Sequence, residues 1–395
     1  MSVTPPVYMD YQATTPLDAR VFKAMQPYFL ERFGNPHSVS HRFGWEAEAG
    51  VEAARKELAG LVNADPKGLV FTSGATESNN LAIKGAMEAL MEHRPHVVSV
   101  ATEHKCVLES VRAMERRGAR VTLLGVNGEG LLDPEDLRRA VGEETALVSV
   151  MAVNNEIGVI QPLAEIGEIC RQAGAYFHCD AAQAIGKIPI DVEAMKIDLL
   201  SISAHKMYGP KGVGALWGRR SRPRVRLRPQ MSGGGQEAGL RSGTLSPPLC
   251  VGLGEAARIA RLEMSEEADR IAALMARFKD QVLAAHPGIL VNGHATQRWP
   301  GNLNLSFPGL DGERLLSELR DLAVSSGAAC ASATSGPSYV LEALGQPREL
   351  AQSAIRFGIG RFTTEEEIDF AAERLIAAVT ALGGIRASDT VAQAS

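Results

Sequence analysis

Short apolar runs rich in β-branched residues alternate with helix-period segments between residues 67 and 216. Seven of these runs are predicted strands, at residues 69–71, 97–100, 119–123, 147–150, 176–178, 199–202 and 213–216. The segments between them are predicted to contain amphipathic helices, at residues 76–91, 104–117, 134–141 and 163–173. This alternation predicts an α/β fold with a mostly parallel seven-stranded sheet covered by helices on both faces. Ligands of such sheets collect at the carboxyl ends of the strands.

The pattern changes after residue 250, where a predicted helix at 251–285 is followed by short strands at 303–306 and 354–357. Thr363 and Thr364 precede two glutamates with capping-box spacing and predict the start of a last helix. A chain of 395 residues exceeds what one core usually supports. We therefore expect a large domain over residues 15–260 and a smaller α+β domain formed by residues 1–14 and 261–395.

The composition, with 45% hydrophobic and 22% charged residues, is that of an ordinary globular protein. A net charge of −5 gives no general attraction to nucleic acid or to anionic membranes. No apolar run is long enough to span a bilayer, and the first residues lack the pattern of a signal peptide. The five scattered cysteines form no Cys-x-x-Cys pair, which favours a reducing cytoplasm and opposes an intrinsic metal site. We expect a cytoplasmic protein that binds neither membranes nor nucleic acid directly.

Two polar residues stand where strands are expected to end. Asp180 ends one apolar run, and Lys206 closes the segment after a later one. Pyridoxal 5'-phosphate (PLP) needs this pair, because a lysine amine holds the cofactor aldehyde as a Schiff base and a carboxylate keeps the pyridine nitrogen protonated. The pair predicts a PLP enzyme.

Other strand-end residues fit the same ligand. Residues 72–78 follow a strand and open a helix, so the amides of Ala75 and Thr76 could hold a phosphate, although a simple N-cap explains them too. His104 could stack on a flat cofactor or be an ordinary core histidine, and Gln183 could donate to the cofactor's phenolic oxygen. The glycine-rich loop at 232–244 lacks the frame of a dinucleotide site, but Thr244 could reach a phosphate from it.

Two readings compete with this one. Residues 203–206 match the Ser-x-x-Lys motif of penicillin-recognising enzymes, whose companion motifs are absent. Arginines at 222, 224, 226 and 228 alternate with other residues and predict the solvated face of an edge strand, or else a surface for nucleic acid or an acidic protein.

Cys330 is the candidate nucleophile, because it lies among small residues at 325–336 that suit a thiol on a travelling loop. Cys106, in the first turn of a predicted helix, is its rival. Arg356, on an apolar strand, is the candidate for a substrate carboxylate, with Arg361 as the competing, more structural choice. We expect the loop at 329–336 to be mobile.

Taken together, the segments resemble the cysteine desulfurases of the NifS/IscS type, in the class V aminotransferase family of PLP enzymes. The resemblance covers about residues 7–380 and is carried by residues 8–16, 34–38, 72–78, 102–105, 153–158, 203–206, 241–244, the Cys330 segment and 355–357. It implies a fold type I PLP-dependent transferase that acts as a homodimer. The implied reaction converts L-cysteine to L-alanine and leaves the sulfur on the enzyme as a persulfide, for transfer to a sulfur acceptor or iron–sulfur scaffold protein.

The resemblance also implies a role for each matching residue. Lys206 would hold the cofactor, Asp180 would meet its pyridine nitrogen, Gln183 its phenolic oxygen, and His104 would stack on the ring. The remaining implied roles fall to Ala75, Thr76, Ser203 and His205 at the phosphate, Thr244 at the phosphate of the opposite subunit, Asn155 and Arg356 at the substrate carboxylate, and Cys330 as the persulfide-forming thiol. No intrinsic metal is expected, with Cys330 a candidate for a transient cluster ligand shared with a scaffold.

Three departures from the family pattern concern the acceptor more than the chemistry. Ala182 stands where relatives often have Thr, residues 334–336 differ from the usual Ser-Leu-Glu, and the longer C-terminal segment of housekeeping members is missing. The sequence leaves open whether cluster assembly or tRNA thiolation is served. A selenocysteine lyase, a class V aminotransferase and an inactive sulfur-transfer scaffold are the alternatives.

Overall fold

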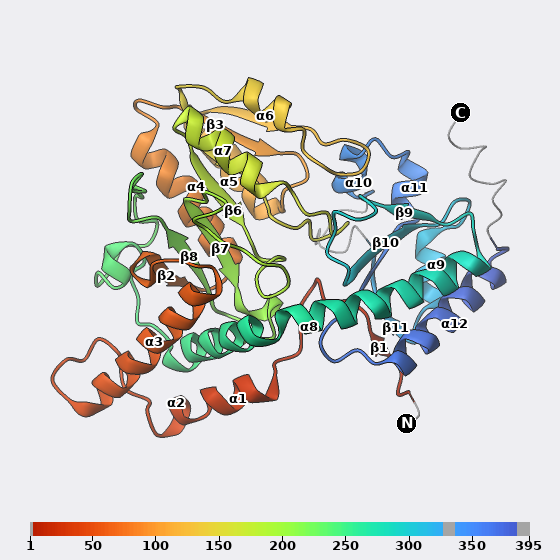
Figure 1. Cartoon of the computed structure of the whole chain (residues 1–395), viewed down its shortest axis with the longest axis horizontal. Coiled ribbons are helices and arrows are strands. Elements are labelled where there is room, and N and C mark those ends of the chain that lie inside the picture. The colour runs from red at the N-terminus through yellow and green to blue at the C-terminus, as the bar shows by residue number, and fades with distance from the viewer. Residues whose placement is uncertain (1–2, 327–335, 385–395) are drawn as a thin grey trace.

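A seven-stranded sheet forms the centre of the larger part of the molecule (Figure 1). The computed structural model describes residues 3–326 and 336–384. The strands lie in the order β2 (Leu69–Thr72), β8 (Gly214–Gly218), β7 (Leu199–Ser203), β6 (Tyr176–Asp180), β5 (Thr145–Ser149), β3 (His96–Val100) and β4 (Arg120–Leu124). β3 to β7 run parallel, and only β8 is antiparallel to its neighbours. The predicted mostly parallel sheet is confirmed.

Helices cover both faces of this sheet because successive strand residues point to opposite sides. Val97, Leu147 and Leu199 pack against α4 (Ala75–Leu90) and α5 (Lys105–Glu115). Their neighbours Val98, Val148 and Leu200 join the main core with α7 (Leu163–Ala173) and α8 (Pro247–Ala285), and α6 (Pro134–Ala140) packs against α7. The predicted helices match these elements to within a few residues.

The smaller part is built on an antiparallel sheet of β12 (Ser325–Ser326), β13 (Ile355–Gly358), β10 (Asn302–Ser306) and β9 (Leu290–Asn292). It also contains α9 (Gly312–Glu318), α10 (Tyr339–Ala343) and α11 (Arg348–Gln352). The last described helix, α12 (Glu365–Ala381), begins with a capping box between Thr364 and Glu367, as predicted. Near the N-terminus, β1 (Val7–Tyr8) pairs with β11 (Leu322–Ala323), so β1 lies beside the C-terminal part (Figure 1).

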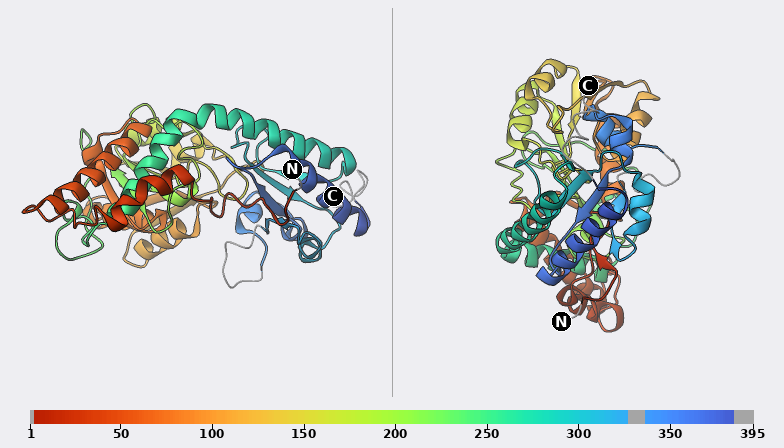
Figure 2. Two further views of the ribbon diagram at one scale, coloured as in Figure 1. Left: turned by 90° about the horizontal axis from the view of Figure 1, so that it is seen from below. Right: turned by 90° about the vertical axis from the view of Figure 1, so that its right-hand side faces the viewer.

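The helix α8 connects the two parts and begins four residues before the helix predicted at 251–285, with the same last residue. Its first half packs on α1 (Ala19–Met25) and α3 (Arg42–Leu61), and its second half on α12 (Figures 1 and 2). A Cβ placed on Gly254 would lie 2.5 Å from the Ala54 Cβ, so a glycine is needed where α3 meets α8. The expected domain boundary at residue 260 falls inside this continuous helix, and the division stays a prediction. No helix among the described residues is long and apolar enough to cross a membrane.

The prediction of an edge strand at Arg222 to Arg228 is wrong. Exposed arginines do alternate with half-buried side chains there, but the segment is irregular and pairs with no strand. Pro223 and Pro229 lack the N–H groups that a ladder needs. The alternation arises instead because Val225 and Leu227 pack against the core under α4.

Candidate active site

A cavity of about 500 Å³ opens where the carboxyl ends of β6 and β7 meet the start of α4. Residues from the N-terminal segment and from β13 complete its wall. The cavity brings together ten of the twelve site residues predicted from the sequence: Ala75, Thr76, His104, Asn155, Asp180, Gln183, Ser203, His205, Lys206 and Arg356. Thr244 and Cys330 are the two others.

Lys206 lies in the short turn that follows β7, and its amine points at the N-terminal segment. The Nζ atom donates to the carbonyl oxygen of Ala13 over 2.8 Å and also to that of Gln12. The sequence reasoning assigned no role to Gln12 or Ala13, although both belong to the motif at residues 8–16. Two backbone carbonyls therefore hold the amine at the cavity wall.

Asp180 is the last residue of β6 and is almost completely buried. Its Oδ2 accepts a hydrogen bond from Asn79 Nδ2 at 2.7 Å, and its Oδ1 accepts one from the Ala182 amide at 2.9 Å. Asn79 was missed by the sequence reasoning, and its signal was its place on α4, one helical turn after Thr76. The two donors fix the carboxylate in a position to meet a cationic ring nitrogen.

The N-terminus of α4 carries features of an anion site. Its N-cap, Gly74, has no side chain to cap the first amides, so these donors remain for a ligand. Gly74 has a φ of 150°, a conformation that favours glycine, and its Cα lies 2.7 Å from where a Cβ on Gly214 would stand. A Cβ on Gly74 would lie 3.9 Å from Ser203 Oγ, so the end of β7 lies beside the N-terminus of α4. The residues fit a phosphate group.

His205 completes this part of the cavity as a neutral ring. Burial and, to a lesser extent, the neighbouring amines of Lys206 and Lys211 together lower the pKa of His205 to about 4. Its Nδ1 lies 3.0 Å from Thr14 Oγ1. The imidazole therefore serves as a hydrogen-bonding group and adds no positive charge at neutral pH.

His104 is the N-cap of α5, and its Nδ1 lies 3.0 Å from the Sγ atom of Cys106. Burial lowers the pKa of His104, an effect that Asp180 opposes, so the ring is neutral at neutral pH. Burial also raises the pKa of the Cys106 thiol to about 12, with the Asp180 charge adding to the rise. Cys106 therefore stays protonated despite its place in the first turn of a helix, and this opposes its candidacy as the nucleophile.

Asn155 and Arg356 lie together on the opposite wall. The Nη1 atom of Arg356 donates to the Asn155 carbonyl oxygen over 2.8 Å, and its Nη2 donates to Asp10 Oδ1 over 2.7 Å. The Asn155 Oδ1 atom is buried without a hydrogen-bond partner in the described structure, which indicates an amide meant for a ligand. Arg361 does not line this cavity, because its guanidinium is bound by Asp18 and Glu267.

The remaining two predicted residues are not in the cavity wall. Thr244 is exposed on the loop before α8. Cys330 and the loop around it lie outside the described residues. The expectation that this loop is mobile therefore stays a prediction. Across residues 3–326 and 336–384, no three His, Cys, Asp or Glu side chains are grouped as metal ligands would be.

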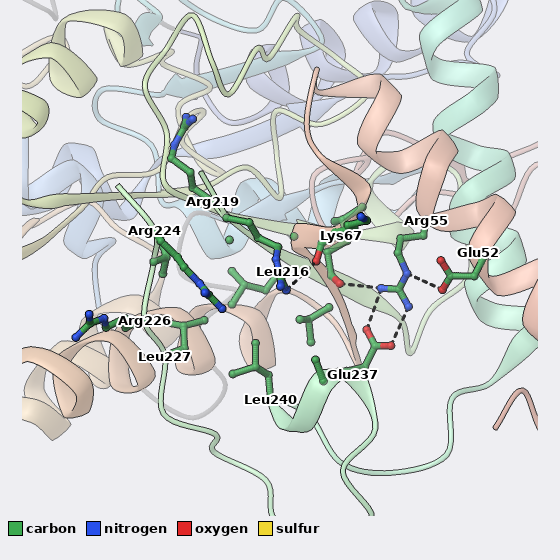
Figure 3. Close-up of a pocket in the computed structure, with 17 residues that line it drawn as sticks. Glu52, Arg55, Lys67, Leu216, Arg219, Arg224, Arg226, Leu227, Glu237 and Leu240 are labelled. Carbon is green, nitrogen blue, oxygen red and sulfur yellow. Dashed lines mark hydrogen bonds and ion pairs between the residues drawn. The ribbon is translucent and has the colours of Figure 1, made fainter. Parts of the chain in front are cut away.

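A second cavity, of about 950 Å³, shows how the glycine-rich loop is anchored (Figure 3). Glu237 enters it from the loop and accepts hydrogen bonds from both Nη atoms of Arg55, at 2.8 and 3.1 Å, and from the Phe71 amide. On the other side of the loop, Arg241 pairs with Glu77 of α4 over 2.8 Å. These contacts hold the segment that carries Thr244 against α3, β2 and α4.

The comparisons with known proteins agree with this geometry. The model of the family described as "Aminotransferase class-V" matches residues 7–370. The chain belongs to the class V aminotransferase family. Within that family it belongs with the cysteine desulfurases. A curated "Cysteine desulfurase IscS" from Rickettsia africae is 56% identical over 370 residues, which cover 94% of this chain and 90% of the relative.

Solved structures of similar proteins share the fold over nearly the whole chain. One titled "NIFS-LIKE PROTEIN" is 36% identical, with a TM-score of 0.88, and the match covers 95% of this chain and 100% of that one. Another, titled "SspA in complex with cysteine", is 34% identical with a TM-score of 0.80 and covers 91% and 100% of the two chains. The fold type predicted from the sequence is confirmed.

Proposed function

We propose that this chain uses PLP to convert L-cysteine to L-alanine, and that the sulfur is left on Cys330 as a persulfide. The observation that carries the proposal is the cavity in which Lys206, Asp180 and the uncapped N-terminus of α4 lie together. A similar protein of known structure, SspA, was solved in complex with cysteine, which supports cysteine as the substrate. When bound, PLP would supply a ring that accepts the electrons released at the substrate Cα.

The chain's own residues would hold this cofactor by complementary chemistry. Lys206 would bind its aldehyde carbon, and Asp180, fixed by Asn79, would keep the pyridine nitrogen protonated. The phosphate would be bound by the backbone amides of Ala75 and Thr76 and by the side chains of Ser203 and the neutral His205. His104 would stack on the ring, and Gln183 would donate to the phenolic oxygen.

The substrate would be held and cleaved by residues on the other wall. Asn155 and Arg356 would bind its carboxylate, the guanidinium giving two parallel hydrogen bonds that a lysine could not. Cys330, as a thiolate, would attack the cysteine sulfur, so that a sulfur–sulfur bond forms while the Cβ–sulfur bond breaks and the carbon product gains a proton to become alanine. The persulfide would then pass its outer sulfur to an acceptor or iron–sulfur scaffold protein in the cytoplasm.

The proposed active form is a homodimer in which Thr244 reaches the phosphate of the partner subunit. An exposed Thr244 outside its own cavity is consistent with this. A cluster of exposed large apolar side chains near the N-terminus would supply a surface to bury: Phe29, Leu30, Phe33, Val39, Phe43 and Trp45. Clusters of this kind on a chain surface commonly mark protein interfaces.

The decisive experiment incubates the purified chain with L-cysteine and measures alanine, pyruvate and protein-bound sulfur. We expect alanine in equal amount to transferred sulfur, a yellow protein, and the loss of both colour and turnover in Lys206→Ala. Release of a keto acid in place of alanine would indicate an aminotransferase. A faster reaction with selenocysteine than with cysteine would indicate a selenocysteine lyase, and a colourless wild-type protein would leave only a scaffold role.

A further inference from the structure

A buried lysine behind the cavity has no role in the chemistry described so far. Lys187 follows the turn after β6, and only 8% of it is exposed. It does not line the cavity. Its Nζ atom donates to the Oε1 atom of Gln183 over 2.9 Å. Burying a lysine is costly, so a lysine retained here points to a specific task for its hydrogen bond.

The other end of the Gln183 amide is also held. Its Nε2 atom donates to the Gln12 carbonyl oxygen over 2.8 Å, and the same oxygen accepts from Lys206 Nζ. A series of hydrogen bonds therefore runs from Lys187 through Gln183 to Gln12, where it meets the amine expected to hold the cofactor. Lys187 is thus linked to the reacting lysine through two intervening groups.

These two contacts favour one orientation of the Gln183 amide. If the amide were rotated by half a turn, its NH₂ group would face the Lys187 amine and its oxygen would face the Gln12 carbonyl. The amide oxygen and the Gln12 carbonyl oxygen would then repel each other, and a protonated Lys187 would face a second donor. In the observed orientation Nε2 keeps a second hydrogen, and Gln183 itself lines the cavity.

The surroundings of Lys187 favour the neutral form of its amine, which can still donate a hydrogen bond. Burial and, to a lesser extent, the nearby cations Lys206 and Arg356 together lower the pKa of Lys187 to about 7, and Glu267 opposes them. A neutral amine still carries N–H groups, so it can hold Gln183 without adding a full positive charge beneath the cavity.

We propose that Lys187 is a positioning residue that fixes the Gln183 amide with its NH₂ group toward the cavity, ready to donate to the phenolic oxygen of PLP. The inference rests on the proposed function. It assigns Lys187 no contact with the substrate or the cofactor.

The test follows the visible absorbance band of the resting, cofactor-loaded protein as a function of pH, without substrate. A phenolic oxygen that loses its donor holds the neighbouring proton more tightly, so Lys187→Met should raise the midpoint by about half a pH unit or more. Gln183→Leu should raise it similarly. The double variant should shift no further than Gln183→Leu alone, because Lys187 acts through Gln183.

Two more variants keep the result interpretable. Lys187→Gln, which retains a neutral NH₂ donor, should restore at least part of the wild-type midpoint even if Lys187→Met folds poorly. Lys279→Met makes the same change at a half-buried lysine of α8 outside the cavity and should shift nothing.

The outcomes separate the two proposals. An unchanged midpoint in Lys187→Met, or fully additive shifts in the double variant, would overturn the role of Lys187 while leaving the cofactor assignment intact. A wild-type protein with no visible band, or Lys206→Ala that keeps the band, would instead overturn the proposed function.

Discussion

Arg356 Nη2 donates to Asp10 Oδ1 over 2.7 Å, and this ion pair joins β13 to the segment that follows β1. Ser325 Oγ also donates to Asp10, over 2.9 Å, immediately before the loop that carries Cys330. One carboxylate therefore organises both the guanidinium that we assign to the substrate and the start of the loop that we assign to the nucleophile. The pair links substrate binding to the base of that loop.

Arg356→Lys should raise KM for cysteine by tenfold or more and change cofactor content little. A lysine ammonium cannot reproduce the two-pronged contact with a carboxylate, and the loss of a charged hydrogen bond costs about 1.5–3 kcal/mol. Steady-state kinetics with absorbance of the bound cofactor checks this. Arg361→Lys is the matched control outside the cavity, and a larger rise in KM there would reassign the carboxylate site.

Cys330→Ser should still bind PLP and cysteine but should lose sulfur transfer by orders of magnitude, because a serine hydroxyl is a poor nucleophile at neutral pH. Cys106→Ser should keep most of its activity, since burial holds the pKa of the Cys106 thiol at about 12. Sulfide release in the presence of a reductant is the measurement. Inactive Cys106→Ser beside active Cys330→Ser would reverse the assignment.

Thr244→Ala should weaken PLP binding about tenfold or more, which is the loss expected for one hydrogen bond to a charged group. Ser246→Ala, at another exposed hydroxyl two residues further along, should bind PLP as the wild type does. Mixed dimers of Thr244→Ala with Lys206→Ala chains should regain one normal site, because each of them supplies what the other lacks. An active monomer in sedimentation would contradict the shared site.

Glu156→Gln should remove the part of the pH dependence of the folding free energy that arises from the Glu156 carboxyl between pH 4.5 and about 7. Burial raises the pKa of Glu156 from 4.5 to about 7, and its Oε1 atom has no hydrogen-bond partner in the described structure. Because the folded-state pKa is raised, the stabilisation is complete below the unfolded pKa of 4.5 and is lost as pH rises to about 7. The wild type should lose up to about 3 kcal/mol relative to Glu156→Gln over this range. Urea unfolding at several pH values measures it, and parallel curves would refute it.

The sheet and the main site residues were predictable because both follow from local patterns. Strand periodicity located the seven strands, and the rule that ligands gather at strand ends selected Asp180 and Lys206 from many charged residues. The prediction of an edge strand at Arg222 to Arg228 was wrong because alternation of exposed and buried side chains indicates burial on one side only. It does not show whether the backbone is hydrogen-bonded to a neighbouring strand. Val225 and Leu227 obtained that burial from α4, without a neighbouring strand.

The residues that hold the main site residues in place could not be predicted from sequence patterns. Gln12 and Ala13 act through backbone carbonyls, which carry no residue-specific signal. Asn79 and Lys187 contact the site through other side chains, and a contact of this kind depends on how distant elements pack. The prediction for α8 missed only its first four residues, where two prolines resemble a boundary although proline suits the first turn of a helix.

The carbonyls that hold Lys206 belong to residues 12 and 13, but the segment before them is fixed by β11 and β13, which lie about 300 residues later in the chain. The segment before Gln12 is held by hydrogen bonds to residues 321–323 and to Gly358, so it cannot take its place until most of the chain has been synthesised. A nascent chain thus lacks a finished cradle for the reactive amine. The cofactor binding that we propose for Lys206 would therefore require β11 and β13 to be in place.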